Sequence, residues 1–148
     1  MRRNAILFGT VLLLALGIGF AQEKDTKDKA QAPDAATPPV SADDAGKKNP
    51  VKPTPEGLAE AKRLYGYHCA MCHGKDGDGK GDLAVSMDLK LHDWRDPSTI
   101  EKMSDGELFY IITNGRGKMV GGEGDRTKEQ IRWNLVNLVH SFGKKSGT

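Results

Sequence analysis

The spacing of apolar and polar positions divides the chain into three parts. Residues 5–21 are uncharged and rich in Leu, Ile, Val and Phe, residues 22–53 hold few large apolar side chains, and residues 54–148 carry apolar positions at helical spacing. We therefore expect a signal peptide or membrane anchor at 1–21, a disordered linker at 22–53 and one folded domain at 54–148.

The first helix of this domain is predicted to begin at Thr54, where a hydroxyl that can cap a helix is followed by Pro55 and Glu56. Gly74 helps to end it. One stripe of the helix carries the residues expected to face inward, which are Leu58, Ala61, Tyr65, His68, Cys69 and Cys72.

Two further helices are predicted from capping boxes, in which a Ser or Thr is followed three residues later by Glu or Gln. The first box, Ser104 to Glu107, opens an apolar helix that stops at Asn114-Gly115. The second, Thr127 to Gln130, opens the last helix, which Gly143 ends. No long strand-like alternation intervenes, so we expect an all-α domain of three to four short helices.

The N-terminal segment has the composition of an export signal. Arg2 and Arg3 precede 17 uncharged residues, Ala5 to Ala21, and Gly19-Phe20-Ala21 has the small-x-small pattern of a cleavage site. As a helix this stretch would span about 25 Å, short of a hydrocarbon core of about 30 Å. A cleaved signal is therefore favoured over a retained anchor, and either one places the domain in the periplasm or otherwise outside the cytoplasmic membrane.

Residues 22–53 are dominated by Ala, Pro, Lys and Asp, and Val40 and Val51 are their only sizeable apolar residues. Such a segment cannot bury enough surface to offset the entropy of ordering it. It would act as a tether if the N-terminal helix is retained, or as an inert spacer if it is cleaved.

The charge of the domain is balanced. Residues 54–148 contain fourteen Lys plus Arg and fourteen Asp plus Glu, so the net charge of +2 comes from Arg2 and Arg3. A nucleic-acid-binding domain would carry a basic patch or stripe. We therefore exclude nucleic acid as a partner.

The most specific motif of the chain is Cys69-Ala70-Met71-Cys72-His73, which contains its only two cysteines. Two cysteines three apart, followed at once by histidine, form the attachment motif for c-type haem. A redox disulfide would be expected in a βαβ setting, which is not predicted here. A structural zinc site would need four ligands, usually from two paired clusters, and the chain has one.

The motif resembles that of a mono-haem, class I c-type cytochrome of bacterial type. The resemblance implies one covalent haem c, with Cys69 and Cys72 as thioether anchors and His73 as proximal iron ligand. It also implies that the first and last helices cross, so that Ala61 and Tyr65 meet Leu135 and Leu138. We expect the haem-free chain to be largely unfolded, because these helices would lack the group they pack around.

The second axial ligand is expected to be Met119. It follows a glycine-rich run and has no apolar partners at helical spacing, and residues 111–119 resemble the segment that delivers the axial Met in cytochromes c. His92, or an open or water-bound site, are the alternatives. The family usually has Pro where this chain has Val120, and Pro near the place of Asp82.

The Asp76 to Gly81 run and Trp94 each have more than one possible role. The run Asp76 to Gly81 has the first positions of a calcium loop, but Lys80 stands at a ligand position and Met87 replaces the final Glu, so we reject calcium. Trp94 is expected either against the haem edge or in the core. A backbone carbonyl between Gly79 and Asp82 is expected to accept the proton of His73.

Together these features predict a one-electron carrier that is not an enzyme and that exchanges electrons with redox protein partners. The alternatives are a haem subunit of a larger dehydrogenase or oxidase complex, and a haem enzyme or gas sensor with a displaceable axial ligand. An enzyme would normally need a distal acid–base group, for which only His92 is a candidate.

Overall fold

The computed structural model describes residues 39–121 and 123–144, apart from the side chains of residues 124 and 125. The predicted signal or anchor at 1–21 and most of the predicted linker lie outside the described residues. Three helices form the body of the domain: α2 (Pro55–His68), α6 (Asp105–Asn114) and α8 (Glu129–Lys144). One-turn helices surround them: α1 (Ala42–Ala45), α3 (Ala70–His73), α4 (Asp82–Ser86), α5 (Pro97–Ile100) and α7 (Glu123–Arg126).

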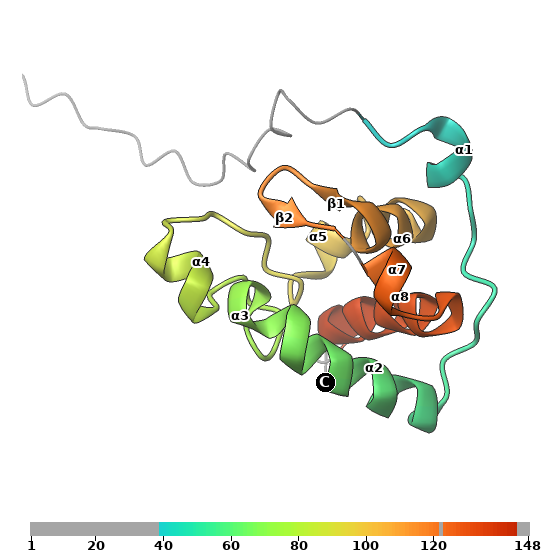
Figure 1. The fold of residues 1–148 in the computed structure, drawn as a ribbon, viewed down its shortest axis with the longest axis horizontal. Helices are drawn as coiled ribbons and strands as arrows, with labels where there is room; N and C mark the ends of the chain where they lie inside the picture. Colours follow the sequence, from blue (N-terminus) through green and yellow to red (C-terminus); the bar gives the residue numbers. More distant parts are fainter. Residues whose placement is uncertain (1–38, 122, 145–148) are drawn as a thin grey trace, which may run out of the picture.

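Helices α2 and α8, from opposite ends of the domain sequence, pack directly against each other (Figure 1). The first core cluster lies between them and consists of Ala61, Tyr65, Leu135, Leu138 and Phe142. This confirms the predicted contact of the first and last helices. Burial of these side chains supplies the main favourable free energy that holds the pair together.

A second core cluster joins α8 to α5 and α6 on its other side. Its buried members are Ile100, Leu108, Trp133, Val136 and Val139, and Met103 packs against them. The Trp133 ring stacks on Phe109 with centroids 3.9 Å apart and planes 15° apart. Helix α8 is therefore buried on two faces, which accounts for its long run of buried positions.

The predicted helix starts are observed for α2 and α6. The Thr54 side chain accepts a hydrogen bond from the Gly57 N–H, and Ser104 accepts one from Glu107 N–H, each at 3.1 Å. Helix α6 ends at Gly115, whose φ of 81° is readily adopted only by glycine. The all-α prediction is thus confirmed, with one small exception.

That exception is a hairpin of β1 (Gly115–Arg116) and β2 (Met119–Val120), in which Arg116 pairs with Met119. It lies between α6 and α7 in the sequence. The start of α8 also differs from the prediction, because the Thr127 hydroxyl donates to Glu123 Oε2 at 2.7 Å. Thr127 thus joins α7 to α8, and α8 begins at Glu129.

Residues before the predicted domain boundary at residue 54 are in contact with the domain. Residues 41–52, here called the N-terminal strap, lie against α6 and α8. The Asn49 side chain donates to the Trp133 carbonyl and to Asn137 Oδ1, both at 3.0 Å, and Ser104 donates to the Ala45 carbonyl at 2.6 Å. Polar side chains order the strap, which a prediction based on apolar content misses.

Among the described residues, none of the helices is long and apolar enough to cross a membrane.

Candidate haem-binding site

The predicted attachment motif lies where α2 meets α3. The chain leaves helical geometry at Cys69, with φ −115° and ψ −38°, and α3 follows as a separate turn, where one continuous helix to Gly74 was expected. The N–H groups of Cys72 and His73 both bond the Cys69 carbonyl, at 3.1 and 2.9 Å. One tight turn therefore carries both thiols and the imidazole.

Both cysteines are free thiols and are partly buried. Burial, together with the charges of Glu123 and Cys72, raises the pKa of the Cys69 thiol to about 12. A redox-active Cys-x-x-Cys pair needs the opposite, a thiol with a lowered pKa. The site therefore does not have the electrostatics of a thiol–disulfide exchange centre.

The His73 side chain is held neutral. Burial, together with the charge of the neighbouring His92, lowers its pKa to about 4. A neutral imidazole has a lone pair available for a metal, whereas an imidazolium has none. Its Nδ1 atom is buried and has no hydrogen-bond partner among the described residues, so the expected backbone acceptor is not found.

A glycine-rich loop wraps closely around this turn. The Gly79 N–H bonds the His73 carbonyl at 2.9 Å, and the Gly81 N–H bonds the Cys72 carbonyl at 3.0 Å. At Gly81 an added Cβ would lie 2.3 Å from the Met71 carbonyl oxygen, so no larger residue fits there. The loop that resembled a calcium site thus fixes the backbone of the attachment motif.

Trp94 covers the face of the His73 ring. The two ring centroids are 4.2 Å apart and the planes differ by 16°, which is a stacked arrangement. The segment before Trp94 lies close to the glycine-rich loop, since a Cβ on Gly79 would meet the Leu91 and His92 carbonyls at 2.9 Å. His92 is also near enough to His73 to lower the pKa of the His73 imidazole.

Met119 lies on β2 and is partly buried. In Figure 1 the hairpin β1–β2 and the turn α3 lie in different parts of the domain. The end of α2 contacts the start of α7, where His68 Nδ1, next to Cys69, is 3.0 Å from Glu123 Oε1. Since Glu123 follows Met119 by four residues, their Cα atoms are at most about 14 Å apart.

The Glu123 carboxylate was not foreseen from the sequence. It is nearly buried, accepts from Thr127, pairs with His68 and contributes to the raised pKa of Cys69. A lone Glu on a glycine-rich segment has no local pattern that marks it as buried. Its role depends on a contact with a residue 55 positions earlier, which only the fold reveals.

The residues of the motif fit a covalently bound haem. Two free thiols and a partly buried imidazole lie on one turn, and the buried Nδ1 atom of the imidazole has no hydrogen-bond partner among the described residues. A zinc centre does not fit, because the described residues contain no group of three or more His, Cys, Asp or Glu side chains able to hold a metal ion.

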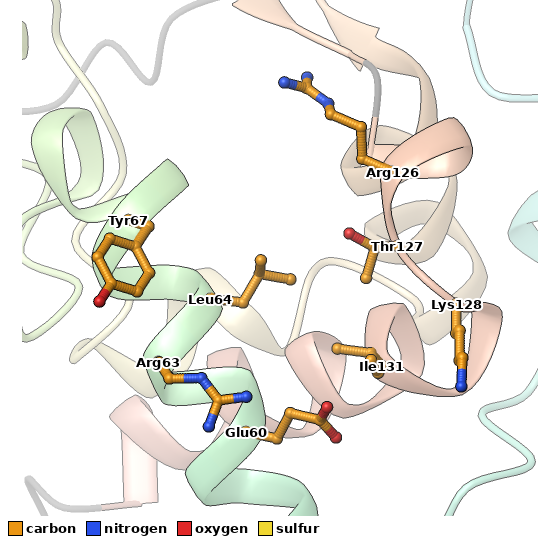
Figure 2. Close-up of a pocket in the computed structure, with 8 residues that line it drawn as sticks. All are labelled: Glu60, Arg63, Leu64, Tyr67, Arg126, Thr127, Lys128 and Ile131. Carbon is orange, nitrogen blue, oxygen red and sulfur yellow. The ribbon is translucent and has the colours of Figure 1, made fainter.

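A separate surface cavity of about 280 Å³ lies between α2 and the α7–α8 junction (Figure 2). Its apolar floor is formed by Leu64 and Ile131, and charged side chains of both signs line it. The eight lining residues include none of the predicted haem ligands; they are Glu60, Arg63, Leu64, Tyr67, Arg126, Thr127, Lys128 and Ile131. This cavity is therefore distinct from the attachment site.

The fold and this turn define a small all-α haem-binding domain. The family model described as Cytochrome c matches residues 58–142, which is more than half of the chain. The chain belongs to the cytochrome c family, carries one covalently bound haem c and has the haem-based electron-transfer chemistry of that family. No curated protein matches it.

Proposed function

We propose that the protein is a one-electron carrier of the bacterial cell envelope. In this proposal Cys69 and Cys72 hold the haem by thioether bonds, and His73 and Met119 are its axial ligands. The bound haem supplies the Fe(III)/Fe(II) couple. The observation that carries the proposal is the partly buried His73 imidazole, with its Nδ1 atom buried, on the same turn as both thiols.

The assignment of Met119 is supported by the course of the chain. The His68–Glu123 contact brings the segment that follows Met119 to the end of α2, beside Cys69. The other methionines have simpler explanations: Met103 packs against the second core cluster, and Met71 and Met87 are about half exposed. A neutral thioether ligand favours ferrous iron and raises the reduction potential.

An electron carrier suits this site better than an enzyme. With both axial positions filled by the protein, the iron has no open place for a substrate. His92, the one candidate for a distal acid–base group, lies beside His73. We place the domain outside the cytoplasmic membrane on the basis of the apolar segment at residues 5–21, with redox proteins as its electron donor and acceptor.

The test is the visible spectrum of protein purified from an export-competent host, together with the mass of the mature chain. We expect the mass of one haem, and a red charge-transfer band of Met-ligated ferric haem that Met119→Ala abolishes. Met87→Ala is the matched control and should keep the band, because Met87 is exposed at the end of α4.

Survival of the band in Met119→Ala would refute the ligand assignment. Rapid binding of CO by the ferrous wild-type protein would favour the enzyme or gas-sensor alternative. Co-purification with a large dehydrogenase or oxidase would make the domain a subunit of that complex, with the same haem chemistry.

A further inference from the structure

Within the described residues, the His73 ring lacks the hydrogen bond that usually fixes the orientation of a metal-bound histidine. Metal-bound histidines generally donate their second ring N–H to a carbonyl, a carboxylate or water, and this bond fixes the ring. Here Nδ1 is buried and lacks any such partner in the described part of the chain. No hydrogen bond from the described protein residues therefore holds the imidazole plane.

The Trp94 indole is placed to do this. It lies nearly parallel to the imidazole, with centroids 4.2 Å apart. A ring stacked this closely restricts rotation about the Cβ–Cγ bond of His73, because a tilted imidazole would collide with it. The apolar indole also offers no acceptor to Nδ1 from its face.

Trp94 is itself firmly positioned. Its backbone N–H donates to the Gly77 carbonyl at 2.8 Å. Its indole lies over Phe142, with centroids 6.4 Å apart and planes 17° apart, and Phe142 is 4% exposed. The residues on either side of Trp94 are also joined, because the Asp93 carboxylate accepts two hydrogen bonds from the Arg95 side chain, at 2.9 and 2.7 Å. The stack is therefore anchored to the end of α8.

We propose that Trp94 is the positioning residue for the proximal imidazole, holding its plane by stacking and keeping Nδ1–H without an acceptor. This inference rests on the proposed function, in which His73 is an iron ligand. An imidazole without that hydrogen bond is a weaker donor to iron than one that has it. A weaker donor favours the ferrous state, so Trp94 raises the reduction potential.

The experiment measures the ratio of reduced to oxidised protein at an ambient potential equal to the wild-type midpoint. Trp94→Leu removes the flat ring and lets water reach Nδ1. We expect the ratio to fall at least about threefold, equivalent to roughly 28 mV at 59 mV per decade. Trp94→Phe keeps an aromatic face and should restore most of the ratio.

Trp133→Leu is the control for a general loosening of the core. Trp133 is also a buried, stacked tryptophan, but its partner is Phe109 in the second core cluster. This variant should lose stability and keep the wild-type ratio. An unchanged ratio in Trp94→Leu, or an equal fall in Trp133→Leu, would overturn the proposal.

A second measurement needs no variant and covers the case in which Trp94→Leu fails to fold. In reduced wild-type protein labelled with ¹⁵N-histidine, the His73 Nδ1–H signal should have the shift of a proton without an acceptor. The shift of a strong hydrogen bond would overturn the inference.

These experiments distinguish an error in the proposed function from an error in the role of Trp94. If the mature protein lacks haem or a His/Met spectrum, the proposed function is wrong. If that spectrum is present and the Trp94 results are negative, only the role of Trp94 is wrong.

Discussion

Tyr65 connects the haem-binding turn to the core of the domain. Its ring packs on Phe142 with centroids 5.3 Å apart, and its hydroxyl donates to the Gly74 carbonyl at 2.6 Å while buried. Burial raises the pKa of Tyr65, with the charges of Cys69, Asp78 and Asp76 adding to the rise, so the hydroxyl stays protonated and able to donate. One side chain thus fixes the residue that ends α3 directly after His73.

Tyr65→Phe should lower the free energy of unfolding by about 0.5–1.5 kcal/mol, because it removes one buried hydrogen bond and leaves the Gly74 carbonyl only its 3.3 Å bond from the Gly77 N–H. Guanidinium denaturation of the haem-loaded protein measures this. Tyr67→Phe is the control on the same helix, where the ring is 74% exposed, and it should change stability by less than about 0.5 kcal/mol. Equal effects in the two variants would show that the Tyr65–Gly74 bond is unimportant.

At the scale of elements, the N-terminal strap is part of the domain. Asn49 N–H donates to Asp105 Oδ2 at 3.2 Å, and Asn137 Nδ2 donates to the Val51 carbonyl at 3.0 Å. Val51 also packs against the second core cluster. The strap covers α6 closely, because a Cβ on Gly106 would lie 2.0 Å from the Asp44 carbonyl oxygen.

A mature chain that begins at residue 54 should therefore be less stable than one that begins at residue 39. Several partly buried hydrogen bonds would be lost at about 1 kcal/mol each, giving a total of about 2–4 kcal/mol. Both chains would be exported behind the same signal and unfolded with guanidinium. Asn49→Ala in the longer chain measures how much the hydrogen bonds of the Asn49 side chain contribute to stability. Equal stability of the two chains would contradict the packing of the strap.

At the scale of the whole molecule, the folded domain and the cofactor depend on each other. The first core cluster continues into Cys69 and Ala70, which pack against it from the attachment turn. The three main helices are 14, 10 and 16 residues long, lengths at which isolated helices are marginal in water. Their stability must therefore come from packing, and in this family the haem is part of what they pack around.

We expect the haem-free chain, made with Cys69→Ser and Cys72→Ser, to be largely unfolded. Circular dichroism should show little helix, and heating should give no sharp transition. Covalently loaded wild-type protein prepared alongside it should melt cooperatively. A native-like cooperative melt of the haem-free variant would contradict this dependence.

Several features followed from the sequence alone because their causes are local. Thr54 and Ser104 cap helices through residues three positions away, and Gly115 ends α6 through its own backbone freedom. The apolar spacing predicted which stripe of α2 and of α8 is buried, whereas the contact between the two helices was predicted from the resemblance to cytochromes c. The attachment motif is local as well, with five consecutive residues identifying the cofactor.

The remaining features were decided by contacts between distant residues, which no local pattern encodes. Asn49 lies in a stretch too polar for a core, yet its amide bonds residues 84 and 88 positions away. Trp94 stacks on an imidazole 21 positions earlier, and Glu123 meets His68 across 55 positions. The free energy of such contacts depends on the geometry that the packed helices create, so only the tertiary structure determines them.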